Sequence, residues 1–418
     1  MNKINMIIIF ILINILLTNQ KMIIPMDESQ SNHLKAYGIA YSYLKNGYKV
    51  EWLLNYRGGS FLLDISEQIK RNCNLKGVTY EELNVEEISM IFSNIEEYNM
   101  EIILLEKPPK IAVYSPPNKQ PWDDAVTLAL TYAEIKYDII FDDEVMNGEI
   151  NKYDWLHLHH EDFTGQYGKF YRYRNKDWYK TMEMDFNLTA KKYNFSSVHK
   201  FKKTIALKIK NYINNGGFLF AMCSATDSFD IALSFYSTDF VHQIYDNTPI
   251  DNNYMSKVDY SNGIAFENYK LYTDPTIYEY SNIDFPSSHK PMTRSAESDY
   301  FTLSNFSAKW DPVPSMLTQN HVNNINGFMG QTTGYDKQFL KPHVVILAED
   351  LYSEQVKYIH GKVGKGTFTF LGGHDPEDYR HFVGDPPTDL DLHRNSPGYR
   401  LILNNILFPA AKKKKKKT

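Results

Sequence analysis

The chain has 418 residues, 43% of them hydrophobic and 14% aromatic, which is enough to bury a sizeable core. The formal net charge of −5 is small and spread along the chain, which argues against a basic surface for nucleic acid. The two cysteines, Cys73 and Cys223, are too few for a disulfide framework, although they could pair with each other in an oxidising compartment.

The first 20 residues have the pattern of a secretory signal peptide. Lys3 precedes a short apolar run from Met6 to Leu17, and polar residues follow it. A membrane span needs about 20 apolar residues, so this run is too short to anchor the chain. We therefore expect residues 1–20 to be removed and the protein to be exported to the periplasm or the cell exterior, without a stable membrane span. A buried first strand of a cytosolic protein is the alternative.

Residues 21–107 predict an N-terminal α/β unit. The expected strands are 22–26, 49–55 and 78–83, and the expected helices are 33–46, 65–74 and 85–97. Strand, helix and strand in succession are typical of a parallel βαβ unit. Four residues follow these strands directly, where open α/β sheets bind ligands, so we expect them to bind substrate: Asp27, Arg57, Gly58 and Gly59. A surface arginine at a turn is the alternative for Arg57.

A larger α/β core is predicted after the crossover at Pro108-Pro109, over 108–238 and 340–411. Its expected strands are 110–115, 137–141, 153–158, 216–222, 343–348, 356–359 and 367–371, and its clearest expected helices are 122–135, 198–214 and 397–405. Residues 239–339 are rich in tyrosine, serine, asparagine and proline and predict a loop-rich insertion or lid. The lysine run in 412–418 predicts a disordered tail.

The core is organised around a strand that ends at Cys223. An apolar run after Gly216-Gly217 indicates a strand that is buried on both faces. Thr226 and Asp227 then offer helix-capping side chains. Strand, tight turn, nucleophile and helix form a nucleophile elbow, and the helix N-terminus favours a thiolate. A buried, inert cysteine is the alternative.

A second strand, 367–371, leads to Gly372-Gly373-His374. The carboxyl ends of parallel strands lie along one edge of a sheet, so we expect His374 to reach Cys223 and act as its base. Glu377 or Asp375 would orient the imidazole. The predicted catalytic residues are therefore Cys223, His374 and Glu377, with Asp375 in contact with substrate. In the alternative, His374 caps a turn.

The segment from His157 to Asp162 also carries chemistry. His157 and His159 share one face of a strand, and Glu161 continues the alternation. This spacing suits a divalent metal, and His381 and His393 could complete such a site. We favour the alternative, in which no metal or other cofactor is bound. His159, His160 and Glu161 would then line the pocket of Cys223 and bind substrate.

The run from Gly216 to Cys223, with a later strand leading to His374 and then Pro376-Glu377, resembles the class I glutamine amidotransferase-like superfamily over roughly 110–409. The resemblance implies a flavodoxin-like sheet with an elbow cysteine and a downstream His-Glu pair. Here Ala221 and Ala225 stand where that family has glycines. Segments 24–27, 53–60, 157–162 and 372–378 also resemble exported proteins of Bacteroidota-type bacteria labelled asparagine synthetase B-like.

Asparagine synthesis itself is not inferred, because that enzyme needs a cysteine directly after the initiator methionine, where this chain has Asn2. The predicted fold is a flavodoxin-like parallel sheet with an N-terminal βαβ extension and a loop-rich insertion. The predicted function is hydrolysis or transfer at an amide-like carbonyl through Cys223. The alternatives are a non-catalytic module that binds a sugar or peptide and a metal-dependent hydrolase. We expect a small molecule, sugar or peptide as partner, and no nucleic acid.

Overall fold

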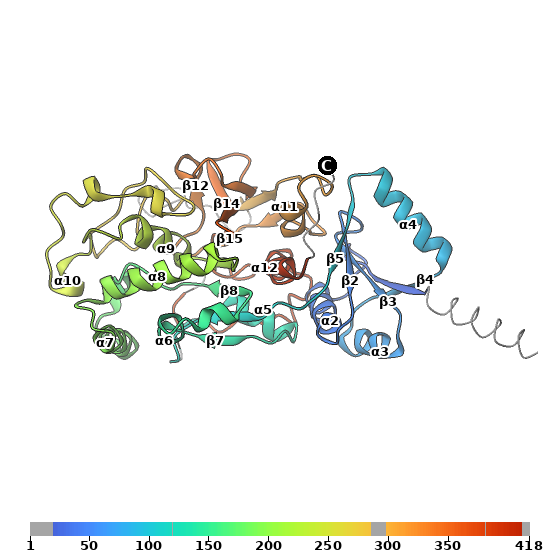
Figure 1. Cartoon of the computed structure of the whole chain (residues 1–418), viewed down its shortest axis with the longest axis horizontal. Coiled ribbons are helices and arrows are strands. Elements are labelled where there is room, and N and C mark those ends of the chain that lie inside the picture. The colour runs from blue at the N-terminus through green and yellow to red at the C-terminus, as the bar shows by residue number, and fades with distance from the viewer. Residues whose placement is uncertain (1–19, 119, 286–297, 381, 412–418) are drawn as a thin grey trace, which may run out of the picture.

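The computed structural model describes residues 20–118, 120–285, 298–380 and 382–411. Two sheets lie side by side along the long axis of the molecule, the smaller one formed by the N-terminal part of the chain (Figure 1). The predicted signal peptide, apart from Gln20, and the lysine tail lie outside the described residues. Within the described residues, no helix is both long and apolar enough to cross a membrane.

The smaller sheet is antiparallel throughout, in the order β4-β1-β3-β2-β5. Its strands are β1 (Lys21–Ile24), β2 (Val50–Leu54), β3 (Ser60–Asp64), β4 (Glu81–Leu83) and β5 (Glu101–Leu105). The prediction of a parallel βαβ extension is therefore wrong. The turn at 55–59 explains why the strands are antiparallel. It returns the chain straight from β2 into β3, with positive φ angles at Asn55, Arg57, Gly58 and Gly59. The sequence-based prediction has no strand at β3.

Both faces of the smaller sheet are covered. Alternate side chains such as Met22 and Trp52 face helix α2 (His33–Lys45), whereas Ile23 and Leu53 face helix α4 (Val85–Glu97). Helix α3 (Glu67–Lys76) lies beside α2. The capping side chains Asn32, Ser66 and Asn84 accept backbone N–H bonds at the starts of α2, α3 and α4.

The larger sheet has a parallel half and an antiparallel half. The parallel half has the order β15-β9-β8-β6-β7. Its strands are β6 (Ile111–Tyr114), β7 (Asp138–Ile140), β8 (Trp155–Leu158), β9 (Phe218–Met222) and β15 (Gly366–Leu371). The predicted parallel sheet thus describes this half only, and the whole sheet is mixed.

The antiparallel half adds β14, β13, β10 and β11 beyond β15, and β12 pairs with β14. Their bounds are β10 (Tyr300–Leu303), β11 (Asn324–Asn326), β12 (Tyr335–Asp336), β13 (Val345–Glu349) and β14 (Gln355–Val363). Three of these strands come from the segment 239–339, so the predicted loop-rich insertion also extends the sheet.

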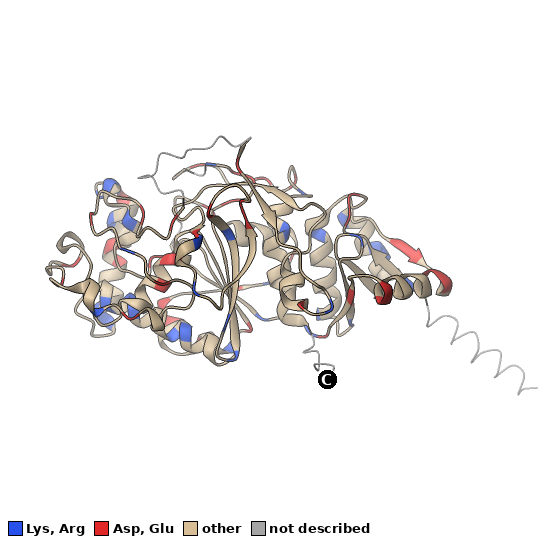
Figure 2. Ribbon diagram, turned by 90° about the horizontal axis from the view of Figure 1, so that it is seen from above, with Lys and Arg blue, Asp and Glu red and all other residues tan. Residues whose placement is uncertain are grey.

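Helices cover both faces of the parallel half, which is why its strands are apolar on both sides. On one face are α5 (Ala125–Tyr132) and α12 (Pro397–Leu407), and on the other α8 (Val198–Asn214) and α9 (Ser224–Ser234). Helix α12 also packs against α2, and so joins the two sheets (Figure 1). The remaining α-helices are α6 (Asp142–Met146), α7 (Asp177–Lys192), α10 (Gln243–Asp246) and α11 (Pro312–Leu317). Acidic and basic residues are interspersed along the whole molecule (Figure 2).

Candidate active site at the carboxyl ends of β8, β9 and β15

Cys223 stands at the turn between β9 and α9. Its backbone has φ 51° and ψ −139°, a conformation that is strained for any residue other than glycine. The small residues Ala221 and Ala225 flank it on either side, and the N–H of Ala225 donates to the carbonyl oxygen of His159. This is the sharp strand-to-helix turn that the sequence predicts, and it directs the side chain above the carboxyl end of the sheet.

Backbone N–H groups surround the sulfur of Cys223. The N–H of Gln331 donates to Sγ at 3.3 Å. Burial raises the pKa of the thiol, and the N–H groups of Thr332, Gln331 and Ser224 lower it in part. The thiol therefore needs a base to become a nucleophile at neutral pH. Cys73 and Cys223 are both free and buried, so the disulfide that the sequence leaves open is not formed.

The tips of β9 and β15 converge beneath Gly330. A Cβ atom at position 330 would lie 3.0 Å from Sγ of Cys223 and 2.9 Å from the backbone N of His374. The N–H of His374 donates to the carbonyl oxygen of Met329, and that of Gly373 donates to Thr332. The segment 329–332 is therefore held over both strand tips, and Cys223 and His374 lie in one site.

Histidine rings from β8 and β15 gather beside this point. The ring of His374 lies with its centroid 4.3 Å from that of His159 and 5.5 Å from that of His160. The indole of Trp122 meets His160 edge-on at 5.1 Å. The predicted pocket residues His159 and His160 thus lie next to the predicted base.

Asp124 completes this group, although the sequence-based prediction missed it. Its Oδ2 lies 3.2 Å from Nε2 of His157 and 3.2 Å from Nδ1 of His159, and its Oδ1 accepts the N–H of Thr127 as the N-cap of α5. Burial opposes ionisation of Asp124, but the two imidazoles hold its pKa well below the usual range. Burial lowers the pKa of His157. An aspartate at a helix start is the one signal in the sequence, and it has the simpler meaning of a cap.

Two overlapping groups of side chains could hold a metal ion. They are Asp124 with His157 and His159, and His159 with His160 and His374; within each, the ligand atoms lie within 4.8 Å of one another. The predicted ligand Glu161 belongs to neither group, which corrects the predicted set. Burial raises the pKa of Glu161 to about 8, so the side chain is largely a neutral acid at pH 7. His381 lies outside the described residues.

The two predicted acids after His374 contact α12 and the segment just before it. Oε2 of Glu377 lies 3.0 Å from Nδ1 of His393, and burial raises the pKa of Glu377. Oδ2 of Asp375 accepts the hydroxyl of Tyr399 at 2.8 Å. The carboxylate of Glu377 therefore interacts with His393, instead of orienting the ring of His374 as predicted.

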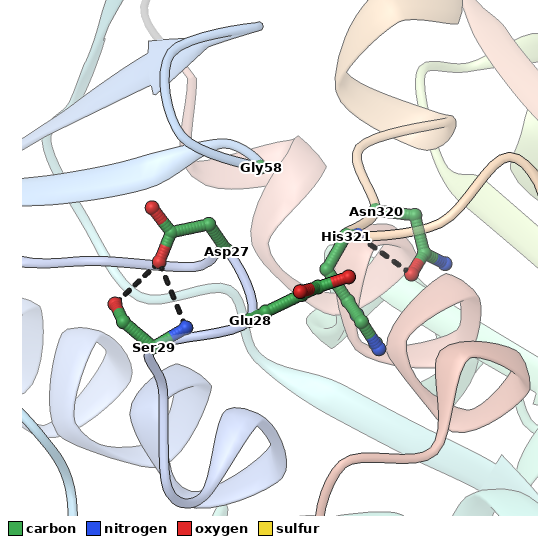
Figure 3. A pocket seen from close by; sticks show the side chains of 6 residues that line it. All are labelled: Asp27, Glu28, Ser29, Gly58, Asn320 and His321. Atoms are coloured by element: carbon green, nitrogen blue, oxygen red, sulfur yellow. Dashed lines mark hydrogen bonds between the residues drawn. The ribbon is translucent and has the colours of Figure 1, made fainter.

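The other predicted substrate residues lie at a different place, between the two sheets. A pocket of about 410 Å³ is lined by Asp27, Glu28, Ser29, Gly58, Asn320 and His321 (Figure 3). Arg57 pairs with Asp27 at 2.6 Å and with Glu81 at 2.9 Å, so this arginine holds the turn in place. The carbonyl of Gly59 accepts the indole N–H of Trp52. The predicted substrate-binding residues thus belong to two separate places.

Comparisons with known proteins assign no family. No family model and no curated protein matches the chain. A cytoplasmic protein of Salmonella typhimurium is 11% identical with a TM-score of 0.32, over 73% of this chain and 100% of that one. A second, from Salmonella typhimurium LT2, is 12% identical with a TM-score of 0.33, over 72% and 100%. A β-galactosidase from Rahnella sp. R3 is 10% identical with a TM-score of 0.27, over 66% and 30%.

These comparisons correct the resemblance drawn from the sequence. Neither the family models nor the curated proteins support the class I glutamine amidotransferase-like superfamily or the asparagine synthetase B-like proteins. That assignment is wrong. The resemblance rests on two short patterns. One is the eight residues that end at Cys223, and the other is His374 with Pro376-Glu377 shortly after it. Short patterns of this kind recur on unrelated folds.

Proposed function

We propose that the chain is a cysteine-dependent hydrolase or transferase that acts on an amide-like carbonyl, with Cys223 as nucleophile. The observation that carries the proposal is the backbone of Cys223, with φ 51° at the junction of β9 and α9. Strain of this kind costs on the order of 1–3 kcal/mol and clusters at active sites. A cysteine that only filled the core would have no need of a strained turn. Export, and a small molecule, sugar or peptide as partner, remain predictions.

The proposal includes a flavodoxin-like arrangement for the parallel half of the larger sheet. Its strand order, β7-β6-β8-β9-β15, is 2-1-3-4-5 when the strands are numbered along the chain. In sheets of this order, ligands bind at the carboxyl ends beside the point where the order reverses, here between β6 and β8. Asp124 follows β6 and His159 follows β8, which supports a ligand site beside Cys223.

In the proposed reaction, Sγ of Cys223 attacks the carbonyl carbon, and a thioester forms as the carbon–nitrogen bond breaks. The thiol proton passes to the imidazole of His374 and from there to the departing amine. The N–H of Ser224, directly after the nucleophile, stabilises the negative charge on the carbonyl oxygen, as is usual at such elbows. Water then attacks the thioester, which releases the acid and restores the thiol.

The segment 329–332 controls access to the sulfur. The side chain of Cys223 is only 2% exposed, and Gln331 donates its backbone N–H to it. The side-chain amide of Gln331 is held by the carbonyl oxygens of Gly168 and Tyr278, each at 2.9 Å. The proposed reaction therefore requires this segment to move before a substrate binds.

The test combines alkylation with a substrate panel. The purified protein is treated with iodoacetamide at neutral pH, and the modified cysteine is identified by peptide mass mapping. Hydrolysis of p-nitrophenyl esters and p-nitroanilides is measured before and after. We expect selective alkylation of Cys223 and loss of hydrolysis in step with it. Cys223→Ala should have no turnover and an unchanged circular dichroism spectrum.

Cys73→Ala is the matched control, because Cys73 is the second buried cysteine and lies on α3 of the smaller sheet. This variant should keep the activity of the unmodified protein. Full turnover in Cys223→Ala would rule out the mechanism. Equally slow alkylation of both cysteines, with no hydrolysis of any substrate, would favour the non-catalytic binding module.

A further inference from the structure

The group at the start of α5 and the end of β8 has the composition of a metal site. Asp124 offers a carboxylate oxygen, and His157 and His159 each offer an imidazole nitrogen. We propose that these three side chains bind one divalent transition-metal ion of the zinc or iron(II) class. Two histidines and a carboxylate are a known ligand set for both ions. This inference does not depend on the role of Cys223.

The spacing of the ligand atoms fits coordination. Oδ2 of Asp124 lies 3.2 Å from Nε2 of His157 and 3.2 Å from Nδ1 of His159. Bonds of about 2.1 Å to one tetrahedral ion place neighbouring ligand atoms roughly 3.4 Å apart. All three ligand atoms lie within 4.8 Å of one another, so one ion can be reached by all three side chains.

A hydrogen bond from the neighbouring strand selects the tautomer of His157. Nδ1 of His157 lies 3.1 Å from the carbonyl oxygen of Phe220, and a carbonyl oxygen only accepts hydrogen bonds. Nδ1 must therefore carry the proton, and Nε2 of a neutral ring presents its lone pair. Nε2 then lies 3.2 Å from Oδ2 of Asp124, where both atoms can bind one metal ion. A backbone carbonyl behind a metal-bound histidine is the usual supporting contact.

The backbone also sets the direction of the carboxylate. Oδ1 of Asp124 accepts the N–H of Thr127 at 2.8 Å, which leaves Oδ2 toward the two imidazoles. His157 and His159 are 0% and 2% exposed, so their ring orientations are fixed by packing. His159 also adjoins His160 and His374. A three-ligand ion leaves a coordination position for water or substrate, and the site adjoins His374 through the ring of His159.

The test measures metal binding directly. The purified full chain is stripped with a chelator, dialysed and titrated with zinc chloride by calorimetry. Metal content is measured by mass spectrometry before stripping and after reloading. We expect one zinc ion per chain and a higher melting temperature in its presence. Asp124→Asn preserves the cap, because asparagine caps helices as well as aspartate does. This variant and His157→Gln should bind zinc about a hundredfold more weakly or worse.

The controls separate this site from others. Asp259→Asn changes another capping aspartate, far along the chain on an exposed turn, and should bind zinc like the original protein. Cys223→Ala should also bind it normally, so failure of the proposed function leaves this test intact. Loss of binding in Cys223→Ala, or unchanged binding in both site variants, would overturn the assignment. So would an absence of saturable binding.

A spectroscopic measurement avoids variants that fail to fold. Cobalt(II) added to the stripped protein should give visible ligand-field bands typical of nitrogen and oxygen ligands. A strong sulfur-to-cobalt charge-transfer band would place the ion on Cys223 and contradict the proposal. The same bands in Asp259→Asn and their loss in Asp124→Asn would assign the ion to this group.

Discussion

Gly330 lies directly over Cys223. A Cβ at position 330 would meet Sγ at 3.0 Å and the backbone of His374 at 2.9 Å. The backbone N of His374 is held by the carbonyl of Met329, so it cannot move away cheaply. Only glycine therefore keeps the segment 329–332 seated on the sulfur, and this contact connects the insertion with the strand tips of the larger sheet.

Gly330→Ala should lift this segment and expose the thiol. Overpacking of this kind costs about 1–3 kcal/mol, so we expect a lower free energy of unfolding and alkylation of Cys223 about tenfold or more faster. Gly47→Ala is the control, since Gly47 has φ 86° but nothing within 4 Å of its Cβ position. The control should lose stability without faster alkylation. An unchanged rate in Gly330→Ala would show that the segment does not guard the sulfur.

Buried Asp227 should make stability depend on pH. Burial raises its pKa to about 7, although Thr332 and Ser228 donate hydrogen bonds to its carboxylate. In the unfolded chain the pKa is about 3.9, so between these values the folded state holds more protons and stability falls as pH rises. The difference corresponds to about 4 kcal/mol. Glu161, with its pKa raised to about 8, acts in the same direction.

Asp227→Asn removes this titration and keeps an acceptor for Thr332. Its free energy of unfolding relative to the unchanged protein should increase from pH 5 to pH 8, as measured by denaturant titration at each pH. Asp259→Asn, at an exposed position, should show no such trend. Parallel pH profiles for Asp227→Asn and the unchanged protein would mean that the buried carboxyl is not the titrating group.

The sequence predicts those helices and strands that a short-range pattern of residues determines. Helix α4 and helix α8 have the bounds that the sequence predicts, and the strand before Cys223 follows from its apolar run. The parallel pairing of the strands that lead to Cys223 and His374 also follows, and it brings the two strand tips to the same edge of the sheet. In such cases one local signal determines the element, and the geometry of a parallel sheet determines which strand ends lie together.

The predictions that the structure contradicts concern contacts between segments that are distant in the sequence or that only folding brings together. Both β2 and β3 have an apolar centre, but only the turn between them shows that the strands are antiparallel. Asp124 reads as a helix cap, and its second oxygen acquires a role only when β8 is placed beside β6. Nearness in sequence assigns Glu377 to His374, whereas folding brings Glu377 to His393.

Acid should loosen the contact between the two sheets. The rings of His33 and His321 stack at 4.3 Å. Burial and the buried guanidinium of Arg400 lower the pKa of His33 to about 4 and that of His321 to about 3. Unfolded histidines titrate near 6.5, so below that pH the unfolded chain binds more protons and stability falls as pH drops from about 6.5 to about 4.

His321→Gln should reduce this acid sensitivity. The expected result is a smaller loss of melting temperature between pH 7 and pH 4.5 than in the unchanged protein, since one half-buried histidine no longer has to be kept neutral. His242→Gln changes a half-buried histidine that caps α10, away from the contact between the two sheets, and should leave the acid sensitivity as it is in the unchanged protein. Equal acid sensitivity in His321→Gln would assign the effect to other groups.

Lys202 and Asp142 form a buried ion pair whose loss should be costly. Nζ of Lys202 lies 2.9 Å from both oxygens of Asp142, and the two side chains are 1% and 0% exposed. Removing one partner leaves an uncompensated buried charge, so Lys202→Met should lower the free energy of unfolding by about 3–5 kcal/mol. The double variant with Asp142→Asn should recover much of this loss, because neither charge then remains.

The matched control is the exposed pair of Lys257 and Asp251, whose atoms also lie 2.9 Å apart. Because water screens that pair, Lys257→Met should change the free energy of unfolding by less than about 1 kcal/mol. Denaturant titrations of all four proteins give the comparison. A cost for Lys202→Met as small as that for Lys257→Met would mean that water reaches Asp142 and that α8 is not closed over α6 at this point.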